Sequence, residues 1–111
     1  MGQDEELVTV SIAGPDEETL AQFVRHLVEN QLAACGNIVT EARSIYRWED
    51  AVSDEGEALV WIHTRRSLVG RIVEAADQYH PYEVPQVLAF PVVEAHPGYR
   101  EWVLNSTSAL T

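Results

Sequence analysis

The chain has 111 residues, and its 18 Asp and Glu against 7 Arg and no Lys give a formal net charge of −11 at pH 7. This acidic balance argues against nucleic-acid binding, which needs a basic stripe to displace counterions, and against adhesion to anionic membranes. The length suits one compact domain, and we expect a single domain over residues 1–111 with an ordered core from about residue 6 to 106.

The one cysteine, Cys35, excludes an intramolecular disulfide and a zinc site made of cysteines alone within one chain. The first residues are acidic and lack the basic start and apolar stretch of a signal peptide. No apolar run approaches the roughly 20 residues of a membrane helix. These features predict a protein of the cytoplasm.

Residues 7–12 alternate apolar and polar side chains, which is the period of a strand. The Gly-Pro-Asp segment at 14–16 interrupts that alternation, and beyond it apolar residues recur at every third or fourth position. Negative charges at Asp16, Glu17 and Glu18 suit a helix N-terminus, so we expect the first helix to begin there.

Residues 33–48 are expected to be extended, with a bend near Gly36 or at 40–41. The acidic, glycine-containing stretch 49–57 is typical of a loop. Apolar side chains then return at 58–64 in a run that predicts a third strand.

Ser67 can cap a second helix, whose apolar side chains again share one face. Residues 86–93 predict a fourth strand, and Pro91 within it suits a sheet edge or a bulge because proline has no backbone N–H. Pro97 is expected to start a short third helix.

The predicted order is β-α-β-β-α-β with an added C-terminal helix. Right-handed crossovers convert this order into an α+β, ferredoxin-like plait, in which two helices cover one face of a four-stranded antiparallel sheet. The strands are nevertheless apolar on both faces, since the third strand gives Val60 to one face and Trp61 to the other. An uncovered apolar face predicts a homo-oligomer; the alternative is that the third helix, with Trp102, folds across it.

Several short motifs follow one another along the chain. They are QLAACGNI at 31–38, SIYRWE at 44–49, TR at 64–65, HPYEVP at 80–85 and YREW at 99–102. Through these motifs, residues 7–105 resemble the CutA divalent-cation-tolerance family. The resemblance implies a homotrimer related in architecture to the PII signalling proteins, with the long second and third strands reaching onto neighbouring subunits. It also implies a role in the response to divalent metal ions, with copper binding in some members.

Cys35, His80 and Glu83 are the candidate metal ligands, because a thiolate and an imidazole suit copper or zinc and a carboxylate can add to them. The alternatives are that Cys35 packs as a small hydrophobe and that His80 caps the second helix. Some family members have soft ligands where this chain has Ile12 and Tyr79. The resemblance therefore implies a site of modest affinity for copper or another divalent cation, with no obligatory cofactor.

A second candidate site is a cleft between subunits that takes a small anion or metabolite. Its residues are Tyr46, Trp48, His63, Arg65, Tyr82 and Glu83. The alternative is that the aromatic side chains form interface core and that Glu83 pairs with an arginine such as Arg47 or Arg65. Lysine is frequent in the family where this chain has His63, so an anion-binding role is not transferred to this residue.

Three functions are therefore compared. The preferred one is a trimeric metal-responsive protein. The rival is a PII-like signal-transduction module that binds a small ligand or an unidentified protein partner. An enzyme is the least favoured, because the chain has no P-loop, dinucleotide fingerprint or other catalytic motif and offers only thiol chemistry at Cys35.

Overall fold

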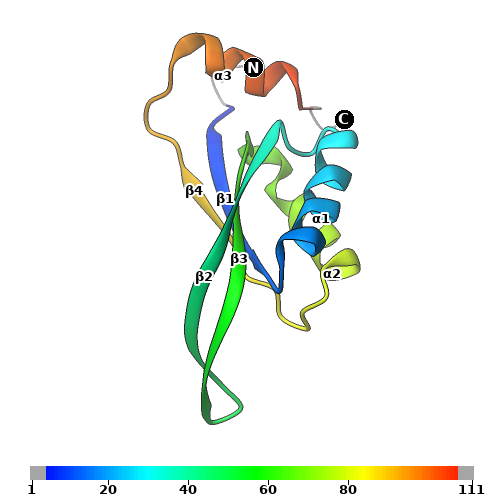
Figure 1. The fold of residues 1–111 in the computed structure, drawn as a ribbon. Coiled ribbons are helices and arrows are strands. Elements are labelled where there is room, and N and C mark those ends of the chain that lie inside the picture. Colours follow the sequence, from blue (N-terminus) through cyan, green and yellow to red (C-terminus); the bar gives the residue numbers. More distant parts are fainter. Residues whose placement is uncertain (1–4, 108–111) are drawn as a thin grey trace.

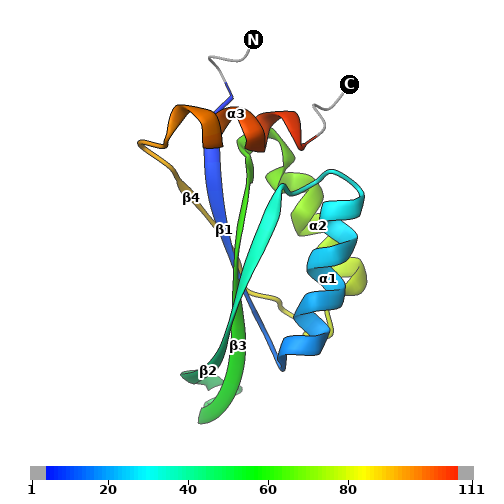
Figure 2. The same cartoon turned by 45° about the horizontal axis from the view of Figure 1, so that its top comes forward.

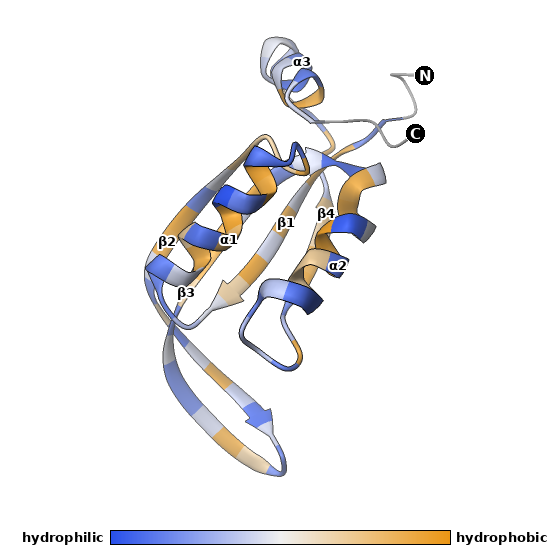
Figure 3. Ribbon diagram, turned by 90° about the vertical axis from the view of Figure 1, so that its right-hand side faces the viewer, coloured by the Kyte–Doolittle hydropathy of each residue, from blue (hydrophilic) through white to orange (hydrophobic). Residues whose placement is uncertain are grey.

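The computed structural model describes residues 5–107, which form a four-stranded antiparallel sheet in the order β2-β3-β1-β4. The elements in chain order are β1 (Leu7–Gly14), α1 (Glu17–Glu29), β2 (Cys35–Trp48), β3 (Ala51–Arg65), η2 (Arg66–Leu68), α2 (Val69–Tyr79), β4 (Val87–Pro91) and α3 (Pro97–Asn105). Helices α1 and α2 cover one face of the sheet, and α3 lies across one end of it (Figure 1, Figure 3). This arrangement confirms the predicted ferredoxin-like α+β plait. No helix within residues 5–107 is long and apolar enough to cross a bilayer.

The hydrophobic core lies between the sheet and these two helices. Val10 of β1 and Val60 and Ile62 of β3 are fully buried, because alternate residues of each strand face the helices. Leu20 and Leu27 of α1 are also fully buried and belong to the same cluster. Each such side chain contributes about 1.5–3 kcal/mol on burial. The apolar faces predicted from the sequence periodicity therefore form the main packing interface.

The two long helices start differently. α1 begins at the acidic residues, as predicted, and Asp16 is its N-cap. The Asp16 side chain accepts a hydrogen bond of 2.7 Å from the Thr19 N–H, and this contact lowers the pKa of Asp16. The prediction that Ser67 caps α2 is wrong. The Ser67 hydroxyl donates instead to the Glu5 carboxylate at 3.0 Å, and the short 3-10 turn η2 leads into α2 without a side-chain cap.

The hairpin of β2 and β3 differs most from the sequence prediction. Residues 49–57 are not a loop, because only Glu49 and Asp50 connect the two strands. Both have positive φ, 51° and 67°, which suits a two-residue hairpin turn. The acidic stretch resembles a loop because it lies on a solvated ribbon, where Arg43 forms two hydrogen bonds of 2.9 and 2.8 Å to Asp54.

Residues 42–57 of this hairpin form a two-stranded arm that projects beyond the rest of the sheet (Figure 1). A register shift after Val39 precedes the arm, at the predicted bend. β1 pairs with β3 only as far as Ala58, so the arm has no further strand beside it within the described residues. Ile45 and Val52 on the arm are 63% and 66% exposed. An isolated ribbon of two strands is only marginally stable in water, so the arm needs an external contact.

The face of the sheet opposite α1 and α2, here called the helix-free face, is largely bare in the single chain. Its exposed apolar side chains are Val39, Trp61, Leu88 and Phe90. Helix α3 lies across one end of the sheet (Figure 2). It contacts the helix-free face near His63, and its own Trp102 is 46% exposed. The third helix therefore does not cover the whole face.

β4 forms one edge of the sheet and is shorter than predicted, covering residues 87–91 rather than 86–93. Pro91 is its last residue, as expected for an edge strand. The next residue, Val92, donates its N–H to the Leu7 carbonyl at 3.0 Å and so leads the chain toward α3.

Candidate functional site

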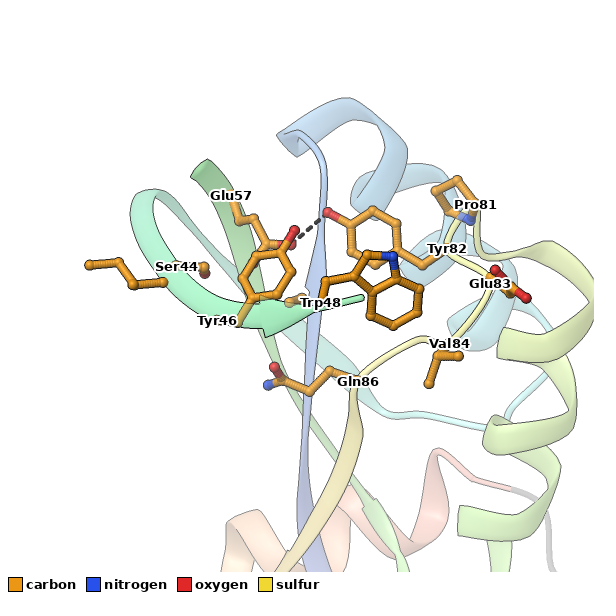
Figure 4. Close-up of a pocket in the computed structure, with 11 residues that line it drawn as sticks. Ser44, Tyr46, Trp48, Glu57, Pro81, Tyr82, Glu83, Val84 and Gln86 are labelled. Atoms are coloured by element: carbon orange, nitrogen blue, oxygen red, sulfur yellow. Dashed lines mark hydrogen bonds between the residues drawn. The ribbon is translucent and has the colours of Figure 1, made fainter. Parts of the chain in front are cut away.

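A pocket of about 610 Å³ lies between the arm and the connection from α2 to β4 (Figure 4). It is lined by Ala13, Ser44, Ile45, Tyr46, Trp48, Glu57, Pro81, Tyr82, Glu83, Val84 and Gln86. Four of the six predicted cleft residues, Tyr46, Trp48, Tyr82 and Glu83, therefore meet within one chain.

Two phenols at this pocket donate hydrogen bonds to carboxylates of β3. The Tyr82 hydroxyl lies 2.5 Å from Glu57 Oε2, and the Tyr46 hydroxyl lies 2.7 Å from Glu55 Oε1. Burial raises the pKa of Tyr82, and the bond to Glu57 raises it further. The bond to Glu55 is the main cause that raises the pKa of Tyr46. Both phenols keep their protons at neutral pH and act as donors.

The charge of the pocket lining is negative. Glu57 and Glu83 are acidic, and none of the eleven residues that line this pocket is Lys, Arg or His. At the effective dielectric constant near a protein surface, one carboxylate attracts a unit cation at 4 Å by ~4 kcal/mol and repels an anion equally. The lining therefore favours a cation, and its carboxylate oxygens are the ligands that hard divalent ions prefer.

One chain does not complete a metal site by itself. Residues 5–107 contain no group of three or more His, Cys, Asp or Glu side chains that could hold a metal ion together. Glu57 and Glu83 lie apart in the pocket (Figure 4), so a divalent ion bound at either carboxylate would take its other ligands from water or from a second copy of the chain.

His80 holds the segment that lines the pocket, because it directly precedes Pro81 and accepts a hydrogen bond from the Tyr82 N–H. It follows α2 and is 7% exposed. Its Nε2 lies 2.7 Å from the Ala13 carbonyl, which can only accept, so Nε2 carries the ring proton and Nδ1 accepts the Tyr82 N–H at 3.1 Å. Both ring nitrogens are engaged, and His80 can bind a metal only by giving up one of these bonds.

Cys35, the other soft candidate ligand, lies at the α3 end of the sheet. Cys35 on β2 pairs with His63 on β3, and His63 pairs with Thr9 on β1. Ala13, whose carbonyl contacts His80, lies four residues further along β1. Four strand residues span roughly 14 Å, so Cys35 and His80 do not meet within one chain. A metal site that uses both of them remains a prediction and requires a second copy.

The remaining predicted cleft residues, His63 and Arg65, also lie at the α3 end. Arg65 is 9% exposed and pairs with Glu5 at 2.7 Å. It also donates to the Thr107 hydroxyl at 2.9 Å and to the Leu104 carbonyl. These contacts tie the two ends of the described chain to the sheet, and they keep Arg65 away from the pocket of its own chain.

Among the polar residues that line the pocket, Ser44, Glu57 and Gln86 are not in the candidate sites predicted from the sequence. Glu57 was missed because residues 49–57 were expected to form a loop. Extending the alternation of the third strand backward by one residue would have placed Glu57 on a strand, on the face opposite Ala58.

The sequence matches known proteins over nearly its whole length. The family model described as CutA1 divalent ion tolerance protein matches residues 8–106. Protein CutA of Mus musculus is 37% identical over 97 residues, which are 87% of this chain and 55% of the mouse protein. Divalent-cation tolerance protein CutA of Thermus thermophilus is 36% identical over 103 residues, which are 93% of this chain and 98% of that protein. The chain thus spans about half the length of the mouse, Arabidopsis thaliana and human relatives that it matches.

Solved structures show the same fold. CutA1 from Oryza sativa superposes with a TM-score of 0.90 at 35% identity, covering 93% of this chain and 94% of the rice chain. The divalent cation tolerance protein from Thermus thermophilus superposes with a TM-score of 0.89 at 35% identity, covering 92% of this chain and 99% of the other.

Proposed function

The chain belongs to the CutA1 divalent ion tolerance family, and from this premise we propose that it is a trimeric metal-responsive protein that binds a divalent cation with modest affinity. The observation that supports this most is the pocket whose lining contains Glu57 and Glu83 but no basic side chain. Its hard oxygen donors suit Mn²⁺ or Mg²⁺ better than copper, which is an optional ligand in this proposal. The proposed role is binding rather than catalysis.

Self-association is proposed because the single chain leaves two apolar surfaces uncovered. The arm exposes Ile45 and Val52, and the helix-free face exposes Trp61 and Phe90. Each large apolar side chain contributes about 1.5–3 kcal/mol when buried, and several together can exceed the cost of association, about 4–15 kcal/mol. The number of three subunits comes from the family resemblance. Sedimentation at micromolar concentration tests it, since a folded particle with the mass of one chain would contradict the proposal.

The metal proposal is tested by titration calorimetry with Mn²⁺, Zn²⁺ and Cu²⁺ on the assembled protein. Glu57→Gln and Glu83→Gln keep the side-chain shape and each remove one charge, so we expect at least tenfold weaker binding, about 1.4 kcal/mol. Glu101→Gln is the matched control, because it removes the same charge from an exposed position on α3, at the other end of the molecule (Figure 1). Equal binding by wild type and Glu57→Gln would refute the pocket as the cation site.

A PII-like signalling module is the second candidate, and the aromatic lining of the pocket favours it. Trp48, which is 44% exposed, and Tyr46 offer flat faces on which a ring-containing metabolite can stack. A small anion would also need a cation, which a neighbouring copy could supply from Arg47 on its arm. A thermal-shift screen of nucleotides and carboxylates tests this role, because a ligand of the native state raises Tm. No shift with any compound would remove this candidate.

The cytoplasm is the proposed location, on the sequence features described above. The relatives in Arabidopsis thaliana and Oryza sativa are named as chloroplastic, and a similar solved protein from Archaeoglobus fulgidus is named as periplasmic. Cell fractionation tests the proposal, and recovery outside the cytoplasmic fraction would contradict it.

A further inference from the structure

The pocket near the arm is larger than a metal ion requires. Its volume of about 610 Å³ lies within the range of about 300–1,000 Å³ that is usual for small-molecule sites, whereas an ion needs only the space among its ligand atoms. In the described part of the chain, no three His, Cys, Asp or Glu side chains gather to enclose an ion. Size and charge together therefore favour an organic cation.

The two carboxylates of this pocket lie apart from each other (Figure 4). The Tyr82 hydroxyl lies 2.5 Å from Glu57 Oε2, and Glu83 directly follows Tyr82, so the length of a phenol side chain separates Glu57 from the backbone at Glu83. Tyr82 uses only one oxygen of Glu57 and leaves Oε1 as an acceptor. Within residues 5–107, Glu83 takes part in no hydrogen bond or ion pair. Each carboxylate can therefore receive its own cationic group.

Aromatic rings lie between these two carboxylates. Tyr46 and Trp48 project from the same face of the arm, because they are two residues apart on β2, and they are 39% and 44% exposed. In the view of Figure 4 the rings of Trp48 and Tyr82 stand between Glu57 and Glu83. The face of an aromatic ring attracts a cation, most strongly at tryptophan, and it also offers apolar contact.

A straight-chain diamine matches this order of groups. Its two ammonium groups are charged at neutral pH, like that of a lysine side chain, and the methylene chain between them is apolar. One ammonium group can reach each carboxylate while the methylene chain lies on the rings. An amine with a single charge would leave one carboxylate without a counter-charge. The net charge of −11 also attracts a dication to the molecule.

We propose that the pocket binds a linear aliphatic diamine, with one ammonium group at Glu57, the other at Glu83 and the methylene chain on Trp48. This inference rests on the proposed assignment of the pocket to cation binding, and it adds a second class of cation. No covalent bond forms or breaks. A diamine and a divalent metal ion use the same carboxylates, so they compete for the pocket.

The arm presents different faces to this ligand and to a second copy. Val52 and its strand partner Arg47 project from the face opposite Tyr46 and Trp48, and Val52 is 66% exposed. A second copy that covers Val52 therefore leaves the aromatic face of the arm directed at the pocket.

Titration calorimetry of the assembled protein at low salt tests the proposal, with putrescine and butylamine as a matched pair of probes. They share the methylene chain, but butylamine has one ammonium group. We expect putrescine to bind at least tenfold more tightly, and Glu57→Gln and Glu83→Gln each to weaken putrescine binding at least tenfold. Glu101→Gln on α3 removes the same charge away from the pocket and should leave putrescine binding unchanged.

Trp48→Leu separates the diamine from a metal ion. It should weaken putrescine binding roughly three- to fivefold, the usual effect of losing one cation–π contact, and leave Mn²⁺ binding unchanged because an ion held by carboxylates does not need the ring. Equal binding of putrescine by Trp48→Leu and the wild type would contradict the placement of the methylene chain.

The wild type alone gives the decisive comparison, so the test does not depend on the folding of any variant. Equal affinities for putrescine and butylamine would overturn the diamine assignment. Mn²⁺ binding that depends on Glu57, together with no binding of putrescine, would overturn it and leave the proposed function standing. Putrescine binding that depends on Glu83, together with no binding of Mn²⁺, would support the diamine and contradict the metal proposal.

Discussion

Replacing Trp61 with glutamate should separate the subunits without unfolding the chain. Trp61 lies on the helix-free face and is 39% exposed in the single chain. For a side chain of about 250 Å² this leaves roughly 100 Å² to be buried by association, which contributes about 2.5 kcal/mol at 25 cal/mol per Å². Loss of that contribution weakens assembly roughly 60-fold per subunit, and a glutamate buried without a partner weakens it further.

Val73→Glu is the matched control for this substitution. Val73 is 41% exposed, almost the same as Trp61, but it lies on α2, away from the helix-free face. Sedimentation velocity should show smaller particles for Trp61→Glu and an unchanged assembly for Val73→Glu, while circular dichroism shows that both variants are folded. If Trp61→Glu assembles like the wild type, the helix-free face is not the contact between copies.

Three further changes test the fold and its electrostatics. Burial alone would raise the pKa of Glu5, but the hydrogen bonds from Arg65 and Ser67 outweigh it and lower this pKa below 4.5. The free energy of unfolding should therefore fall as the pH drops below 4.5, because the carboxylate must then be protonated. Glu5→Gln should flatten this pH dependence when it is measured by urea titrations. A side chain at Gly36 would place its Cβ 2.7 Å from Val24 Cγ1, so Gly36→Ala should cost about 1–3 kcal/mol, and an unchanged midpoint would show that the core yields there. Asp50→Gly should stabilise the arm turn by about 1 kcal/mol, since φ is 67° at that residue, and a lower Tm would contradict this.

The sequence predicted the elements whose periodicity reflects burial inside one chain. Val10 and Leu20 lie on faces that meet in the core, so their spacing was informative. The first strand of the arm was predicted, because residues 33–48 were expected to be extended. Its return strand was missed, because the acidic side chains before residue 58 resemble those of a loop. The prediction that Ser67 caps α2 was wrong because its hydroxyl donates a hydrogen bond to Glu5, which is distant in sequence.

The candidate sites were likewise predicted only where the pattern is local in the sequence. Tyr46 and Tyr82, which were grouped from the family motifs that contain them, line one pocket of a single chain, and their role in a cleft between subunits stays a prediction. The contacts of Cys35 with His63 and Tyr99 span 28 and 64 residues of sequence, and no local pattern reports such a register. Their meeting depends on the alignment of β2 with β3 and on the place where α3 crosses the sheet.

Because the guanidinium of Arg65 holds Glu5 and Thr107 together, polypeptide joined to either end of the described chain leaves from the same pole of the molecule. That pole lies at the α3 end of the molecule, whereas the arm extends from the opposite end (Figure 1). The acidic pocket is lined partly by residues of the arm. A fluorescent reporter or an affinity handle fused at that pole should leave ion uptake intact. Immobilising the protein on a sensor surface by that pole would keep the acidic pocket away from the surface.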